Sequence, residues 1–248
     1  MMCVVALNFS CTLFRNEGSK PRLSMFIGID ISGSFIHGKH FDDALRFTAH
    51  YIAAHLKGLE GLDVPRTLFV GSIGGARPDE PKTFYPIQTF ENLSVEQIIA
   101  KLNEIFPKKI ENPHTDYNAF FEQVSMLVRD KRLVLRPISI VMMTDGDPDT
   151  SMDKKNENEF THINLRSLEN LSRDVTIRLL FTSAETGRGW LTKVKRRRVK
   201  IWTQDASVMT QWKEPNIMIP GKDLLNQQTF FKWILGNVDF AVRAQRVY

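Results

Sequence analysis

The stretch MFIGIDISGS, residues 25–34, decides the fold of this chain, because it joins an apolar run to a loop of small polar residues. The run from Met25 to Ile31 is typical of a strand that is covered on both faces. After the loop, apolar residues recur at helical spacing from Phe41 to Leu56. A buried strand, a polar turn and an amphipathic helix together predict one unit of a parallel α/β sheet.

The same alternation continues along the chain and includes a second decisive stretch, ISIVMMTDGD at residues 138–147. We predict a doubly wound, mostly parallel α/β sheet flanked by helices, a Rossmann-like fold. Pro86 places one strand at a sheet edge, since it cannot donate within a central ladder. Ser94 and Gln97 form a predicted helix-capping pair, and Thr115 or Asp116 caps the next helix. The further predicted strands are 67–73, 83–90, 138–143, 175–181 and 199–202, and the further helices lie near 94–106, 116–128, 165–172, 188–194 and 230–238.

Length and composition indicate one globular domain. The chain has 248 residues, of which 42% are hydrophobic and 25% charged, so a full core can form without disulfides. We place the domain at residues 22–243, after a leader or linker at 1–21 and before a tail at 244–248. No apolar stretch reaches the roughly 20 residues that span a bilayer.

The N-terminal segment, MMCVVALNFSC, contains both cysteines of the chain, Cys3 and Cys11. Its layout resembles the end of a bacterial lipoprotein signal, with Cys11 as the lipidated residue. A basic n-region is missing, however, and Asn8 and Phe9 suit the positions before such a cysteine poorly. A disordered leader or a wrongly chosen start codon explains the same letters, so the compartment stays open between cell envelope and cytoplasm.

The formal net charge of +5 comes from interspersed charges, apart from one basic run, KVKRRRVK, from Lys193 to Lys200. Such a run can contact phosphate or an acidic partner. The simpler interpretation is a solvated helix end that leads into a strand. No aromatic stacking pattern or groove-entering motif accompanies the run, so we expect no specific nucleic-acid binding.

Two predicted strands end in acidic loops, with Asp30 after the first and Asp145 after the strand at 138–143. Because the carboxyl ends of parallel strands meet at one edge, these acids can share a site. Ser32, Ser34 and Thr115 add hydroxyl oxygens. Hard oxygen ligands favour magnesium, manganese or calcium over zinc. We place Asp30 in an exposed loop, so its substitution should spare the fold.

The motif Asp30-x-Ser32-x-Ser34, then Thr115, then Thr144-Asp145-Gly146 resembles the metal-ion-dependent adhesion site (MIDAS) of von Willebrand factor A domains. The resemblance covers residues 25–240. It implies that Ser32 and Ser34 ligate a cation directly, that Thr115 does so directly or through water, and that Asp30 and Asp145 act through bound waters. It also implies an open coordination position for an aspartate or glutamate of a protein partner. One departure is His114, where the family often has glycine.

Each motif residue also has a simpler explanation. Ser32 and Ser34 can cap the following helix, Thr115 can be an ordinary N-cap, and Asp145-Gly146 can be a turn. The acids from Asp145 to Asp153 also approximate an EF-hand loop, but Thr150 and Asn156 replace its glycine and glutamate. We therefore expect Asp147 and Asp149 to form an acidic rim.

Three functions are compatible with these residues. The favoured one is a non-catalytic, cation-dependent binding module for an acidic partner. A scaffold with a structural metal is the second. A phosphate-handling enzyme is the third and weakest, because Ser32 stands where a phosphatase would need an acid and no nucleophile is paired with a base. The six histidines lie in no catalytic motif, and we expect His50 and His55 at a helix surface or boundary: His37, His40, His50, His55, His114 and His162.

Overall fold

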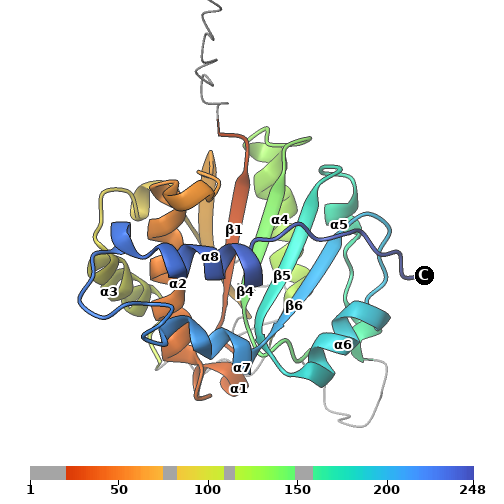
Figure 1. The fold of residues 1–248 in the computed structure, drawn as a ribbon. Helices are drawn as coiled ribbons and strands as arrows, with labels where there is room; N and C mark the ends of the chain where they lie inside the picture. The colour runs from red at the N-terminus through yellow and green to blue at the C-terminus, as the bar shows by residue number, and fades with distance from the viewer. Residues whose placement is uncertain (1–20, 75–82, 109–114, 149–158) are drawn as a thin grey trace, which may run out of the picture.

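The computed structural model describes residues 21–74, 83–108, 115–148 and 159–248. These ranges form a six-stranded sheet in the order β3-β2-β1-β4-β5-β6 (Figure 1). All neighbouring pairs are parallel except β2 and β3. The predicted doubly wound, mostly parallel α/β fold is confirmed. Its strands are β1 Ser24–Asp30, β2 Thr67–Ile73, β3 Phe84–Pro86, β4 Ile138–Met143, β5 Val175–Thr182 and β6 Lys200–Asp205.

Helices cover both faces of this sheet, with α2 and α8 in front and α4 behind in the view of Figure 1. Short 3-10 turns connect several of them. The α-helices are α1 Gly33–Ile36, α2 Phe41–Leu56, α3 Val95–Ile105, α4 Tyr117–Asp130, α5 Arg166–Glu169, α6 Ala184–Lys193, α7 Ala206–Met209 and α8 Gln228–Asn237. The 3-10 turns are η1 Leu59–Gly61, η2 Ile87–Thr89, η3 Glu159–His162, η4 Thr210–Lys213 and η5 Leu224–Asn226.

Strand β1 lies in the middle of the sheet, and every one of its residues is buried. Successive side chains of a strand point to opposite faces. Met25 and Ile27 accordingly pack with α2, α3 and α8 in one core cluster, whereas Phe26 packs with α4 in the other. Gly28 shares the face of Phe26, and a Cβ there would lie 2.8 Å from the Phe120 ring. Only glycine therefore lets α4 approach the sheet this closely.

The strongest periodic patterns are found where they were predicted. The capping box at Ser94 is present, with Gln97 as its partner, and Asp116 rather than Thr115 caps α4 through the N–H of Ala119. The predicted edge strand is at the edge but covers only Phe84–Pro86 before turning into η2. The helix expected at 165–172 is limited to one turn, α5, and α7 with η4 were not predicted.

Within the described ranges, no helix combines the length and the apolar composition that a membrane crossing requires. The leader at 1–20 with Cys11, the residue His114 and the acids Asp149 and Asp153 lie outside the described residues.

Candidate metal centre

The candidate centre lies where the order of winding reverses. Strand β1 has β2 on one side and β4 on the other, so the crossovers leave it in opposite directions. In open α/β sheets, ligands bind outside the carboxyl ends of the strands at this point. Asp30 is the last residue of β1, and Asp145 follows the end of β4 by two residues. The fold therefore brings the two predicted acids to one crevice.

Asp30 is completely buried, which corrects the expectation that it occupies an exposed loop. Its Oδ1 accepts the backbone N–H of Ser32 at 2.9 Å, and its Oδ2 accepts the hydroxyl of Thr144 at 2.6 Å. Burial and then the charge of Asp145 raise the pKa of Asp30 to about 7, although both hydrogen bonds act in the opposite direction. The carboxyl group is thus held firmly in position but poorly compensated for its charge.

Thr144 is the residue that connects the two strand ends. Its hydroxyl donates to Asp30, so it can only accept from the other two groups that contact it. These are the hydroxyl of Tyr117, at 2.8 Å, and the backbone N–H of Gly146, also at 2.8 Å. Burial, followed by the charge of Asp30, raises the pKa of Tyr117, so its phenol keeps the proton that it donates. The sequence motif included Thr144, but no role was assigned to it. No sequence signal identified Tyr117 as part of the site.

Ser32 and Ser34 present their hydroxyls beside Asp145. The two Oγ atoms are 3.2 Å apart, and Ser34 also hydrogen-bonds the Asp145 carboxyl group. Burial raises the pKa of Asp145, while the bonds from Ser34 and from the Asp147 N–H oppose the rise. Ser32 occupies the N-cap position of α1 but its side chain makes no capping bond. The capping explanation for Ser32 is therefore wrong.

Thr115 lies immediately before Asp116, the cap of α4, and is half-buried. Tyr117, two residues further on, donates to Thr144, so the start of α4 borders the crevice. Because Asp116 supplies the cap, the interpretation of Thr115 as an ordinary N-cap is also wrong. Its membership of the ligand set stays a prediction.

The loop after β4 is fastened to α6. Trp190, fully buried, donates its indole N–H to the carbonyl of Gly146 at 2.7 Å, and Thr186 donates its hydroxyl to Asp147 at 2.7 Å. Gly146 has φ of +79°, and a Cβ there would lie 3.0 Å from the methyl groups of Thr182 and Thr186. This glycine is thus required by both conformation and space, and it keeps Asp145 at the crevice.

The oxygen groups suit a hard divalent cation. Adjacent ligands on an octahedral magnesium ion lie about 3 Å apart, since each is about 2.1 Å from the metal, and the Ser32 and Ser34 hydroxyls are 3.2 Å apart. In the described part of the chain, no cluster of three or more His, Cys, Asp or Glu is placed to hold a metal. A cation here would depend on hydroxyl oxygens, which differ from the sulfur and nitrogen ligands of a typical zinc site.

Comparison with known proteins finds no matching family model and no matching curated protein. Among solved structures, the chain is similar to proximal thread matrix protein 1 from the mussel byssus, at 10% identity and a TM-score of 0.46 over 77% of this chain and 46% of that chain. It is similar to the human COPII-coat protein Sec24c at 8% identity and a TM-score of 0.46, over 77% and 31% of the two chains. A second structure of the thread matrix protein has a zinc-occupied MIDAS motif, with 11% identity and a TM-score of 0.45. This chain therefore spans less than half the length of these proteins.

Proposed function

We propose that this protein is a non-catalytic binding module that captures an acidic side chain of a protein partner through one divalent cation. Asp30, Ser32, Ser34, Thr115 and Asp145 would hold the cation, as the resemblance to von Willebrand factor A domains implies. Magnesium is the first candidate, with manganese or calcium as alternatives. The bound ion would keep one open coordination position, and a carboxylate of the partner would fill it.

One observation carries this proposal: the buried Asp30 and the half-buried Asp145 converge at one edge of the sheet, and the carboxyl group of each has a raised pKa. The ion pairs between described residues include neither Asp30 nor Asp145. Buried charges in proteins are normally paired or coordinate a metal. A cation would therefore remove the main electrostatic cost of this arrangement.

A binding role is favoured over catalysis by the partners of the hydroxyl groups. Ser32 bonds Ser34, and Ser34 bonds Asp145. Among the described residues, His50 and His55 hydrogen-bond the Arg46 carbonyl, the Asp63 carbonyl and Asp239 instead. A serine nucleophile requires a neighbouring base to accept its proton. The proposal accordingly includes no hydrolytic turnover.

Calorimetry with MgCl2 and MnCl2 tests the site. The wild-type protein should bind one ion per chain, and Asp145→Asn should weaken binding by at least tenfold, because it removes a negative charge beside the bound ion. The matched control is Asp130→Asn, the same change on an exposed side chain at the far end of α4. Equal metal affinity in Asp145→Asn and wild type would reject the site.

Partner capture tests the function separately from the metal. Proteins retained by the immobilised module in magnesium and released by chelator should be lost from Thr115→Ala, while thermal unfolding of that variant stays close to wild type. If metal binds with the expected stoichiometry and capture ignores both chelator and Thr115→Ala, the scaffold alternative is correct and the ion is structural.

A further inference from the structure

A basic groove runs along the side of the molecule that carries α6, η3, α5 and the C-terminal segment. It has a volume of about 1040 Å³. We define it by five cationic residues and one acid, which are Arg166, Lys195, Arg196, Arg197, Arg198 and Glu169. The residues of the sequence run KVKRRRVK thus form one wall of a concave surface, rather than only a solvated helix end.

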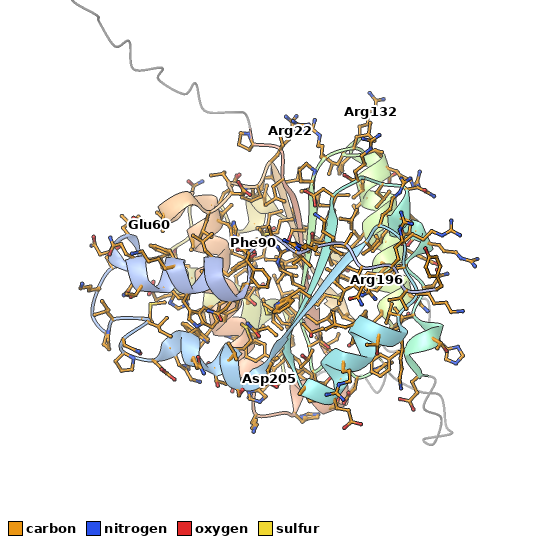
Figure 2. The ribbon with its side chains drawn as sticks, turned by 45° about the vertical axis from the view of Figure 1, so that its right-hand side comes forward. Arg22, Glu60, Phe90, Arg132, Arg196 and Asp205 are labelled. Carbon is orange, nitrogen blue, oxygen red and sulfur yellow. The ribbon has the colours of Figure 1, made fainter. Side chains whose placement is uncertain are left out.

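Arg196 forms the floor of the groove and is only 3% exposed. Figure 2 labels it beside α6 and the C-terminal segment. Its guanidinium Nη atoms donate to the carbonyls of Trp190, Leu191 and Val194 at 2.9 to 3.2 Å, which caps the C-terminus of α6. Its Nε, also buried, has no hydrogen-bond partner among the described residues. Arg196 thus adds a buried positive charge to the lining of the groove.

The backbone of Arg196 also fixes the shape of the groove. It pairs in both directions with Val247, with N–H to O distances of 2.9 and 3.0 Å. This antiparallel bridge holds the C-terminal segment against the loop after α6. The groove wall is thus tied by main-chain bonds and does not depend on its exposed side chains.

The remaining cationic side chains of the groove are exposed: Arg166, Lys195, Arg197 and Arg198. The ion pairs formed between described residues include none of these four. Glu169 is the one acid in the described lining, and both its oxygens are already used by the backbone N–H groups of Arg197 and Arg198, at 2.6 and 2.9 Å. The lining therefore keeps a clear excess of positive charge.

We propose that this groove binds an acidic peptide segment of a protein partner, through the guanidinium groups of Arg197 and Arg198. Guanidinium groups match carboxylates in a bidentate geometry. One carboxylate, that of Glu169, is already bound in the groove by the consecutive backbone N–H groups of Arg197 and Arg198. None of the candidate metal ligands lines the groove, so this binding does not require the metal centre.

Single-stranded nucleic acid suits the groove less well. Proteins of that class add a series of aromatic rings on which successive bases stack. The described lining offers only Tyr248 and His162 as rings, and neither takes part in a ring pair with another described residue.

The test is fluorescence anisotropy with a labelled octaglutamate peptide, measured on the full chain in chelator so that the metal centre does not contribute. Arg197→Ala/Arg198→Ala should weaken binding about tenfold, since each exposed cation contributes a factor of a few. Arg197→Lys/Arg198→Lys should lose less, because it keeps the charge and only the bidentate geometry is lost. Binding to wild type should also weaken as salt is raised.

The matched control is Lys131→Ala/Lys232→Ala, which removes the same charge from two exposed positions outside the groove lining. It should bind the peptide like wild type. Arg166→Ala provides an independent groove variant should the double alanine variant unfold. Equal weakening in the control variant would show that only net charge matters and would overturn the proposal. So would tighter binding of an oligothymidylate of equal charge.

Discussion

Two buried aspartates of this protein have opposite electrostatic surroundings. Asp239, whose side chain is 13% exposed, lies between His55 and Arg178, at 2.9 and 3.8 Å, and accepts the hydroxyl of Tyr51 at 2.7 Å. Burial alone would raise its pKa, but these hydrogen bonds and positive charges together lower it. Asp30 has hydroxyl and amide donors but a second carboxyl group as its nearest charge, and its pKa is raised.

The fold neutralises the charge of Asp239 but leaves the charge of Asp30 uncompensated. Both ring nitrogens of His55 lie within hydrogen-bond distance of oxygen atoms, those of the Asp63 carbonyl and of Asp239. Arg178 is held in turn by the carbonyls of Val238 and Phe240. The Asp239 cluster is thus complete within the chain. The Asp30 cluster has every neutral bond it needs and lacks only a positive charge.

Asp239→Asn should produce the largest effect in this comparison. Removing one member of a buried ion pair leaves the other charges unpaired, which costs about 3 to 5 kcal/mol. Urea unfolding measures this loss of free energy. Asp174→Asn is the control, because that residue is 53% exposed and its pair with Lys200 should contribute at most about 1 kcal/mol. A similar loss of unfolding free energy in both variants would show that the ion pairs of Asp239 contribute no more than an exposed pair.

Magnesium should stabilise the wild-type fold by a smaller amount. A ligand present at 100 times its Kd adds about 2.7 kcal/mol to the free energy of unfolding. The increase should disappear in Asp145→Asn and persist in Asp239→Asn, measured as the difference from the same variant in chelator. If magnesium raises the stability of Asp145→Asn as much as that of wild type, the ion binds elsewhere.

The smallest expected effect is a loss of stability at acidic pH. Because the folded state lowers the pKa of Asp239, its contribution to stability is complete above the ordinary aspartate pKa of about 4. It is lost as the pH falls from there through the lower pKa of the folded state. Wild type should therefore lose more stability than Asp239→Asn between pH 5 and pH 3. Parallel pH profiles for the two proteins would mean that Asp239 is not stabilised in its ionised form.

The sequence predicted the elements whose signals are local. β2 and β4 have the predicted bounds, and β1 is displaced by one residue, because apolar runs bounded by polar turns indicate buried strands directly. The capping box at Ser94 was predicted for the same reason. The lengths of β3 and α5 were predicted wrongly. β3 ends at Pro86, which we had used to place the strand at the edge but not to end it, and α5 ends at Glu169 with no breaker residue to mark its end.

For the site, sequence order and strand ends indicated which acids would meet, but not their burial. Asp30 was expected in an exposed loop and is fully buried, and His55 was expected at a helix surface or boundary but is 2% exposed. Each depends on a partner far along the chain, Thr144 for Asp30 and Asp239 for His55. Arg178 is a charged residue within an apolar strand, and its partner Asp239 also lies far along the chain, after α8. Such pairs become recognisable once the sheet order is known.

The central position of β1 has a consequence for how the protein is made. Thr144, which closes the bond to Asp30, is 114 residues further along the chain. At about 5 to 20 residues per second, the ribosome needs roughly 6 to 23 seconds to add this stretch. Throughout that interval the apolar β1 has β2 as a neighbour at most, and its other edge stays without β4. An open, hydrophobic strand edge is a site of aggregation, so nascent chains of this protein should depend on chaperones until β4 emerges.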